Sequence, residues 1–285
     1  MSPIALRLLF VAPTVSALVV AGLQSTPKLK RMRPPGMSHC NIYPIFSIKD
    51  LALAKPYMQE CVEATDAEPG CLYYGWTISE DQSTLFCRET YVDGKAAASH
   101  LAAAGPIVGK MLDAGGVVLE SIGVMGTDAD LADVQEQGDK LGCAYWRVYD
   151  SFSNFRKEGS VVPSSQAFLT LQPTFSINDM ATAEPFMKQC VEATRAEAGC
   201  VYYGWTISSD GKLFCREAYV NGAAVNTHLI NAVPIVGAML ESGAVSLDKI
   251  ELHGPRSEWA ACKEEADKLG MVYFDVDASF AKFAL

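Results

Sequence analysis

The chain contains two copies of one sequence of about 110 residues, a common domain size, and this duplication limits the folds open to it. Residues 70–79 read GCLYYGWTIS, and residues 199–208 read GCVYYGWTIS. One residue is lost in the turn that follows, and the match then resumes and includes His100 and His228. Solenoid repeats are much shorter than these copies. We therefore expect two related domains.

Residue periodicity predicts the same element order, β-α-β-β-α-β followed by α-β, in each copy. Pro44 and Pro173 lie within the first strands and predict an edge position or a bulge there. Pro106 and Pro234 are expected to interrupt the second helix of each copy. The expected strands are 42–48, 70–79, 85–92, 118–124 and 144–152 in the first copy, and 169–177, 199–208, 213–220, 246–252 and 271–280 in the second.

This order is that of the ferredoxin-like split βαβ fold. Its antiparallel sheet carries helices on one face, so the other face needs a partner. The second copy supplies that partner within the same chain. We therefore expect an α+β protein in which two ferredoxin-like units, each with an extra α-β, pack their sheets together. The expected domains are 39–153 and 168–285, joined by a polar linker at 154–167.

Residues 1–38 are expected to be a targeting segment. The first acidic residue is Asp50, and the apolar run Leu8–Leu23 is short for a membrane span. We interpret this run as the apolar region of a signal peptide. The basic stretch that follows resembles a plastid transit segment behind a signal, with a mitochondrial presequence or a signal anchor as alternatives. The mature protein is expected to be soluble.

Charge and motif content narrow the classes of function. The net charge of -10 and the pI near 4.9 argue against nucleic acid, because a protein that binds the phosphate backbone needs a basic surface. The sequence has no glycine-rich phosphate loop, no HExxH, no GxSxG and no CxxC. We therefore expect no nucleotide, flavin or metal. Of the nine cysteines, Cys61 and Cys190 are expected on the core faces of helices, with a catalytic thiolate as the alternative role.

Three motifs resemble the antibiotic biosynthesis monooxygenase family, including its quinol monooxygenase-like members. They are GCxYYGW, then LFxRExYxxGxA, then HL a few residues later, and they match most strongly over 70–109 and 199–237. The resemblance implies a dimeric α/β barrel, formed here by a tandem duplication, and an oxygenase that needs no cofactor. The expected first strands lack an Asn that some members use, and Tyr91 and Tyr219 stand where those members have Trp.

The resemblance assigns the family's strand carboxylate to Glu89 and Glu217 and its helix histidine to His100 and His228. A buried neutral imidazole beside a carboxylate can act as a general base near pH 7. We therefore expect the histidines to be catalytic bases and the glutamates to orient them. The alternative is a hydrogen-bonded core histidine, with each glutamate in an internal ion pair or bonded to a tyrosine.

Aromatic side chains near these residues are the expected substrate contacts. Strand alternation places Leu72 on one face with Tyr74 and Trp76, and Cys71 on the other face. One hairpin register sets Tyr74 opposite Glu89, whereas a slip of one residue exchanges the faces, and the sequence leaves this choice open. Ordinary core packing is the alternative role. The candidate contacts are Tyr74, Trp76 and Tyr91 in the first copy and Tyr203, Trp205 and Tyr219 in the second.

The sequence thus predicts a cofactor-independent, monooxygenase-like enzyme acting on a small phenolic, quinol or polyketide-type substrate. A flat apolar pocket would suit such a planar aromatic ligand. The alternative is a non-catalytic scaffold that binds a hydrophobic ligand or supports assembly. The two domains are expected to pair within the chain, with further oligomerisation left open.

Overall fold

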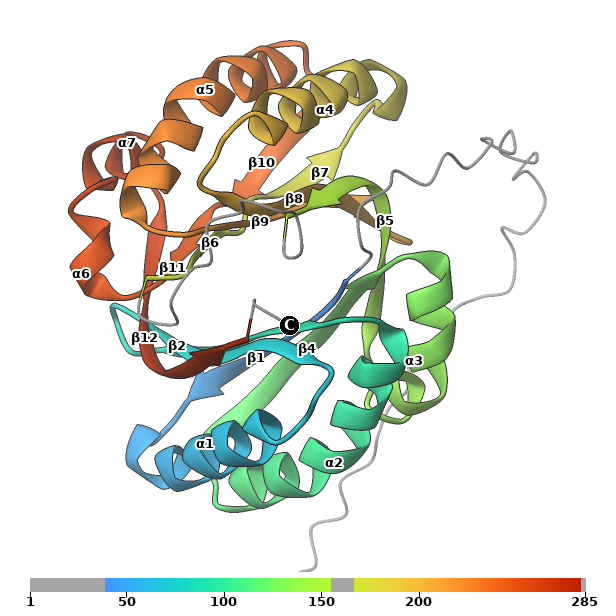
Figure 1. Cartoon of the computed structure of the whole chain (residues 1–285), viewed down its shortest axis with the longest axis vertical. Helices are drawn as coiled ribbons and strands as arrows, with labels where there is room; N and C mark the ends of the chain where they lie inside the picture. The colour runs from blue at the N-terminus through green and yellow to red at the C-terminus, as the bar shows by residue number, and fades with distance from the viewer. Residues whose placement is uncertain (1–38, 155–166, 283–285) are drawn as a thin grey trace, which may run out of the picture. The chain divides into compact units, whose positions relative to one another are not determined.

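Both copies fold in the predicted element order, and helices cover one face of each strand layer (Figure 1). The computed structural model describes residues 39–154 and 167–282. The expected targeting segment and nearly all of the expected linker lie outside the described residues. The first copy comprises β1 (Cys40–Ile48), α1 (Leu51–Asp66), β2 (Cys71–Ser79), β3 (Thr84–Tyr91), α2 (Gly94–Asp113), β4 (Val117–Gly126), α3 (Asp128–Lys140) and β5 (Ala144–Ser153).

The second copy repeats this order, with two of its strands interrupted and its last helix divided. Its elements are β6 (Leu169–Leu171), β7 (Thr174–Ile177), α4 (Met180–Arg195), β8 (Cys200–Ser208), β9 (Lys212–Tyr219), α5 (Gly222–Glu241), β10 (Val245–Lys249), β11 (Glu251–His253), α6 (Arg256–Trp259), α7 (Lys263–Lys268) and β12 (Val272–Ala281).

The strands of both copies close into one ten-stranded barrel, in which β6 with β7 and β10 with β11 each fill one position. From β8 the order runs through β9, β6/β7, β10/β11, β12, β2, β3, β1, β4 and β5, and then back to β8. Only β4–β5 and β11–β12 are parallel among the described strand pairs. The expected dimeric α/β barrel within one chain is confirmed.

Each copy donates its last strand to the other copy. β12 pairs antiparallel with β2, and β5 pairs antiparallel with β8. In these pairings Gly75 lies opposite Ser279, and Gly204 lies opposite Ser151. A Cβ atom at either glycine would collide with the serine that faces it. The donated strand therefore explains why a glycine separates the aromatic residues of both YYGW motifs.

The two strand prolines lie inside the barrel wall. β1 pairs with both β3 and β4, so the expected edge position of Pro44 is wrong, because closure of the barrel gives β1 a neighbour on each side. The expected bulge is present, as a register shift between Ile45 and Phe46. Pro173 separates β6 from β7, and its carbonyl accepts a hydrogen bond from the Cys215 backbone.

Pro106 and Pro234 do not interrupt their helices. α2 and α5 continue through them, which corrects the expectation from sequence. Each proline removes one backbone N–H, so the carbonyl four residues earlier loses its helical donor. Those carbonyls belong to Ala102 and Ile230, which are exposed residues, so water can hydrogen-bond to them.

The β2–β3 hairpin sets which side chains face the helices. It has the register in which Tyr74 lies opposite Glu89. A register shift between Cys71 and Tyr73 marks a bulge at the start of β2. Because a bulge adds one residue, Cys71 packs on the helix-facing side with Tyr74, and Leu72 packs with Tyr73 on the opposite side. Simple alternation is therefore wrong at this end of β2, and β8 shows the same register shift.

The inner face of the barrel joins the two copies through buried arginines. Arg88 of β3 donates hydrogen bonds to Oγ1 of Thr170 over 3.3 Å and to the carbonyl of His253 over 3.1 Å. In the reverse direction, Arg216 of β9 donates to Oδ1 of Asn41 over 2.9 Å. Both guanidinium groups lie on the face of the sheet opposite to the neighbouring glutamates, as strand alternation predicts.

The first strand begins earlier than predicted, at Cys40, and therefore includes Asn41. The side chain of Asn41 donates to the carbonyl of Glu89 over 3.1 Å and to Oγ1 of Thr90 over 2.9 Å. It also accepts the hydrogen bond from Arg216, so it belongs to the inner face of the barrel. Asn41 thus lies on the far side of the sheet from the carboxylate of Glu89.

Candidate functional site

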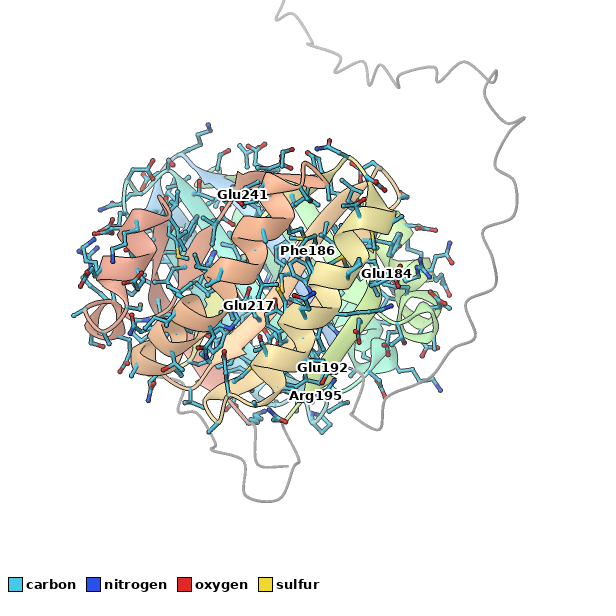
Figure 2. All side chains as sticks on the ribbon, turned by 90° about the horizontal axis from the view of Figure 1, so that it is seen from above. Glu184, Phe186, Glu192, Arg195, Glu217 and Glu241 are labelled. Carbon is cyan, nitrogen blue, oxygen red and sulfur yellow. The ribbon has the colours of Figure 1, made fainter. Side chains whose placement is uncertain are left out.

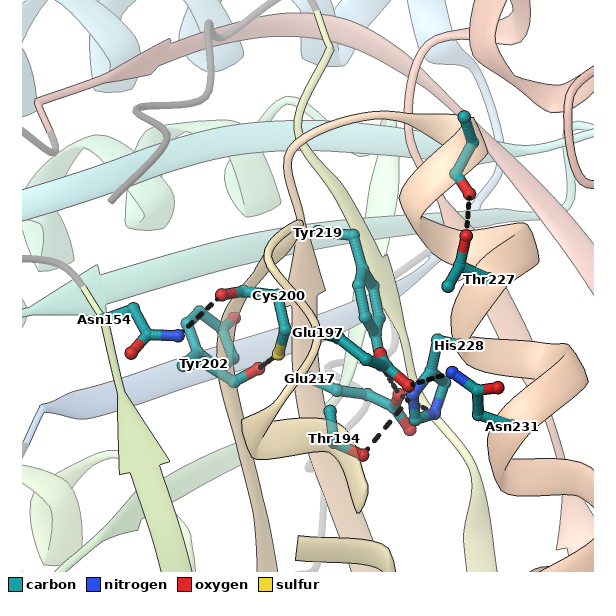
Figure 3. A network of polar contacts seen from close by, with 11 residues as sticks. Asn154, Thr194, Glu197, Cys200, Tyr202, Glu217, Tyr219, Thr227, His228 and Asn231 are labelled. Atoms are coloured by element: carbon teal, nitrogen blue, oxygen red, sulfur yellow. Dashed lines mark hydrogen bonds and ion pairs between the residues drawn. The ribbon is translucent and has the colours of Figure 1, made fainter. Parts of the chain in front are cut away.

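In the second copy, His228 lies between two carboxylates. Its Nδ1 is 3.1 Å from Oε2 of Glu197, and its Nε2 is 3.0 Å from Oε2 of Glu217 (Figure 3). All three side chains are buried. A neutral imidazole has one donor nitrogen and one acceptor nitrogen, so only the protonated ring can donate to both carboxylates. The geometry therefore favours an imidazolium.

Three elements bring these side chains together. His228 lies on the buried face of α5, a helix that begins after Asn221, whose side chain caps the first turn. Glu217 lies on β9 and faces the helix layer, and Figure 2 looks down on α4 and α5 with Glu217 on the strand beneath them. Glu197 lies in the turn that follows α4. The site is thus held by a strand, a helix and a helix-terminal turn.

Further donors orient both carboxylates. The hydroxyl of Tyr219 donates to Oε2 of Glu217. The side-chain amide of Asn231 donates to Oε1 of Glu197 over 3.1 Å. Hydrogen bonds to a charged group are stronger than those between neutral groups. Each carboxylate therefore has a hydrogen-bond donor besides the imidazole, and these bonds fix the position of the ring between them.

The carboxylates determine the charge of the histidine. Burial alone would lower the pKa of His228, because a buried imidazolium loses its hydration. Glu217 and Glu197 outweigh this effect and raise the pKa to about 9. At neutral pH the site therefore contains an imidazolium between two glutamates.

The first copy has the same arrangement around His100. Its Nδ1 is 3.1 Å from Oε2 of Glu68, and its Nε2 is 3.2 Å from Oε2 of Glu89. The hydroxyl of Tyr91 donates to the same oxygen of Glu89 over 2.8 Å. Burial lowers the pKa of His100, but Glu89 and Glu68 outweigh burial and raise it above its ordinary value. Burial also raises the pKa of Glu89, against the opposing effects of the histidine and the tyrosine.

The two copies differ around the carboxylate of the turn, Glu68 in the first copy and Glu197 in the second, which we call the outer carboxylate. The position of Asn231 is taken by Ala103 in the first copy, so the amide donor to the glutamate is lost. The side chain of Glu68 is 24% exposed, whereas that of Glu197 is 6% exposed. The second copy therefore holds its histidine in a more enclosed and more completely hydrogen-bonded setting.

An apolar pocket of about 120 Å³ lies between α5 and the strand layer of the second copy. Its inner end is formed by buried residues, namely Leu171, Tyr203, Trp205, Glu217 and His228. Its outer end is formed by partly exposed residues, namely Val233, Val236, Leu240, Leu247 and Leu269. The Glu217–His228 pair is thus the polar end of an otherwise apolar pocket.

The predicted contacts of the second copy lie on the helix-facing side of the sheet. Tyr203 and Trp205 line the pocket. Tyr219 contacts Glu217 without lining the pocket. The indole nitrogen of Trp205 donates to the carbonyl of Met187 over 3.1 Å, so the edge of the indole is fixed by α4.

The predicted contacts of the first copy surround its histidine in the same way. The ring centroids of Tyr74 and Tyr91 lie 5.5 Å and 5.0 Å from that of His100. The indole nitrogen of Trp76 donates to the carbonyl of Met58 over 3.1 Å. The structure thus brings all ten predicted site residues into two equivalent clusters, one for each copy.

Sequence reasoning missed Glu68 and Glu197. Each follows the first helix of its copy and precedes the Gly-Cys pair of the repeated motif. Their recurrence at the same place in both copies was the available signal. A carboxylate in a turn carries no pattern of its own, so nothing in either copy alone would have identified it.

Each cluster is also covered by a phenylalanine from the other copy. Phe280 of β12 stacks on Tyr74 with a centroid separation of 6.2 Å, and Phe152 of β5 stacks on Tyr203 with a separation of 6.3 Å. These contacts exist because the last strands are exchanged. Neither cluster is complete within one copy.

All nine cysteines are free, and none offers a thiolate at neutral pH near the histidines. Burial raises the pKa of Cys61 and Cys190 to about 12. Burial likewise raises the pKa of Cys87 and Cys215 well above the ordinary value. In the described part of the chain, no group of three or more His, Cys, Asp and Glu side chains could hold a metal ion.

Comparison with known proteins identifies the fold. No family model and no curated protein match the chain. A candidate monooxygenase from Fusobacterium nucleatum superposes with a TM-score of 0.55 at 12% identity, covering 87% of this chain and 96% of that one. The fold is that of the dimeric α/β barrels.

Two further solved structures have lower scores. A candidate monooxygenase from Lactobacillus acidophilus has a TM-score of 0.47 at 14% identity, covering 75% of this chain and 91% of that one. An anthrone oxidase-like protein has a TM-score of 0.44 at 10% identity, covering 85% and 93% respectively. At these identities the likeness concerns the fold, and activity has to be argued from the site.

Proposed function

We propose that this dimeric α/β barrel is a monooxygenase-like enzyme that oxidises a small phenol or quinol without a cofactor. One observation carries the proposal, namely the apolar pocket of the second copy that ends at Glu217 and His228. A pocket of this kind holds a planar ring by apolar contact and places its polar group against a buried charged pair. Its volume of about 120 Å³ favours one ring over a polycyclic polyketide.

The proposed reaction balances without an external reductant. A phenol and O2 give a quinone and water: a ring C–H becomes C=O with one oxygen atom, and the other oxygen atom leaves as water. The substrate supplies all the electrons. Its anion is a better electron donor to O2 than the neutral phenol, so the protein's task is to remove the hydroxyl proton and to stabilise the anion.

We assign the two parts of this task to two residues. His228 is already protonated at neutral pH, so the proton acceptor of the pair is the carboxylate of Glu217. The imidazolium beside it stabilises the phenolate that forms, in a site with few other polar groups. This assignment exchanges the roles expected from sequence, because a ring with carboxylates on both nitrogens has no free acceptor.

The first copy supports a second candidate function. There the same pairing joins α2, β3 and the turn after α1, and its outer carboxylate is partly open to solvent. A buried histidine that contacts two carboxylates at a junction of three elements is sufficient as a structural clamp. We therefore assign catalysis to the second copy and stabilisation to His100 and Glu89.

Oxygen consumption by the full chain with a panel of single-ring phenols and quinols tests the proposal. Two matched substitutions are compared, His228→Gln in the second copy and His100→Gln in the first. We expect turnover to fall at least tenfold in His228→Gln and to remain within about twofold in His100→Gln when both proteins are folded, since a general acid–base or electrostatic contribution is worth roughly this much or more. Equal rates in all three proteins would remove the site assignment, and no turnover with any substrate would favour the scaffold.

A further inference from the structure

The ionisable groups of the second copy's pocket lie at its buried end. Glu217 and His228 lie at the bottom, whereas the outer end is formed by apolar side chains. Val233 and Leu247 at this outer end are 37% and 39% exposed. A ligand must therefore enter with its polar group first and leave its apolar part toward the surface.

The size of the pocket sets how much of a ligand it can enclose. A cavity of about 150 Å³ in another protein is enough for one benzene ring. The pocket here, at about 120 Å³, is filled by a single ring. Any substituent on the far side of the ring must pass between Val233 and Leu247 and continue outside the pocket.

An apolar surface continues from the outer end of the pocket along α5. Ile230 precedes Val233 by three residues, so their side chains are neighbours on the helix, and Ile230 is 58% exposed. The equivalent residues of α2 are Ala102 and Gly105, which offer almost no apolar surface. The exposed apolar pair of Ile230 and Val233 is thus specific to the second copy.

We propose that the natural ligand of this pocket is a single-ring phenol or quinol that carries a long apolar chain, bound head first. The hydroxyl contacts the Glu217–His228 pair, the ring fills the pocket, and the chain passes between Val233 and Leu247 to lie on Ile230. This inference rests on the proposed function for the position of the hydroxyl. It adds the apolar chain, which a reaction at the ring does not require.

Binding of 4-alkylphenols to the full chain tests the chain-binding surface directly. Titrations with 4-ethyl-, 4-butyl-, 4-hexyl- and 4-octylphenol are followed by the fluorescence of Trp205, which lines the pocket. Trp205→Phe and Trp76→Phe are the matched controls for the origin of the signal, and only the first should abolish the change. We expect up to about fourfold tighter binding for each added methylene, until the chain extends past Ile230, since a fully buried methylene is worth about 0.8 kcal/mol.

A substitution outside the pocket tests where the chain lies. Ile230→Asp is expected to reduce the ratio of octylphenol to ethylphenol affinity at least tenfold, while Ala102→Asp, at the equivalent position of the first copy, should leave that ratio unchanged. Affinity that does not vary with chain length, or a ratio that Ile230→Asp does not change, overturns the inference. Chain-length dependence without any oxygen consumption would instead overturn the proposed reaction and leave the ligand class standing.

The same chemistry is available from two sources, a dissolved alkylphenol and a quinol held in a bilayer. Phosphatidylcholine vesicles that contain octylphenol distinguish them. If occupancy of the pocket is retained at equal total octylphenol, the ligand can be taken from a bilayer. If occupancy falls as lipid is added, the ligand is taken from solution.

Discussion

Asn231 donates a hydrogen bond to the carboxylate of Glu197 over 3.1 Å, and the first copy has no such bond because Ala103 occupies the equivalent position. This contact separates two otherwise matching histidine sites. It lies at the outer carboxylate, on the side of the imidazole away from the strand glutamate. For each residue of one site, the equivalent residue of the other copy can therefore serve as a control within the same chain.

Removal of this bond should raise the pKa of His228. The side-chain N–H of Asn231 partly neutralises the charge of Glu197, so in Asn231→Ala this carboxylate should stabilise the imidazolium more strongly and raise the pKa by up to about half a unit. NMR titration of the histidine ring nitrogens measures this shift. The reverse substitution, Ala103→Asn, should lower the pKa of His100. Unchanged titration of both rings would show that the amide does not act on the histidines.

The raised pKa of His228 makes stability depend on pH in one direction. Its value in the folded state is about 9, above the ordinary value of about 6.5. The protonated ring therefore contributes stability that is fully present below pH 6.5 and is lost as the pH rises toward 9, roughly 3 kcal/mol in all. Urea unfolding between pH 6 and pH 9.5 measures the loss. His228→Gln should show a smaller decrease over the same range, and an equal decrease would contradict the assignment.

Neutralising the strand carboxylate of the second copy should reduce the free energy of unfolding more than neutralising the outer carboxylate of the first copy. Glu217→Gln leaves a buried imidazolium with one carboxylate, and we expect a loss of about 3 kcal/mol. Glu68→Gln affects a partly exposed carboxylate and should cost at most about 1 kcal/mol. Chemical unfolding at pH 7 gives both values. A larger loss in Glu68→Gln than in Glu217→Gln would reverse this ranking.

Filling the pocket should block the ligand without disturbing the histidine. Ala232 lies on α5 and lines the pocket, and Ala104 is its equivalent on α2. In Ala232→Phe we expect at least tenfold weaker binding of 4-butylphenol, because the phenyl group occupies the space of the ring. Ala104→Phe should bind as the wild type does. Circular dichroism confirms that both variants are folded, and normal binding by a folded Ala232→Phe protein would exclude this pocket as the site.

The nine thiols should react slowly in the folded protein. Eight are buried, and Cys143 is only partly exposed, with its pKa raised by burial to about 11. Reaction with a disulfide reagent at pH 7.5 should modify at most Cys143 within minutes, because the thiolate is the reactive form. All nine should react after denaturation. Rapid reaction of several thiols in the native state would show that the barrel opens readily.

The duplication made most of the fold predictable. Periodicity placed the strands and helices, and the need to cover a sheet face predicted that the copies would pair. The exchange of the last strands was not predictable in this way, because it depends on long-range pairing between residues such as Phe152 and Tyr203. The bulge at Leu72 was also missed, since a single extra residue leaves the local pattern almost unchanged.

The candidate site was predictable in part. The strand glutamates and helix histidines followed from the family resemblance, and the structure places each pair within hydrogen-bonding distance. The outer carboxylates were not foreseen, because Glu68 and Glu197 lie in turns without periodicity. The upward pKa shifts of the two histidines arise from the strand glutamates and, in part, from Glu68 and Glu197, so the sequence revealed only part of their cause.

The exchange of β5 and β12 has a consequence for any attempt to divide this protein. In a fragment that ends before the second copy, the final strand β5 keeps its pairing with β4 but loses its antiparallel partner β8, and Tyr74 lacks the covering Phe280. Such a half must recruit another half to complete its ring of strands. Co-expressed halves should therefore reassemble without a covalent connection, in the manner of a split reporter protein.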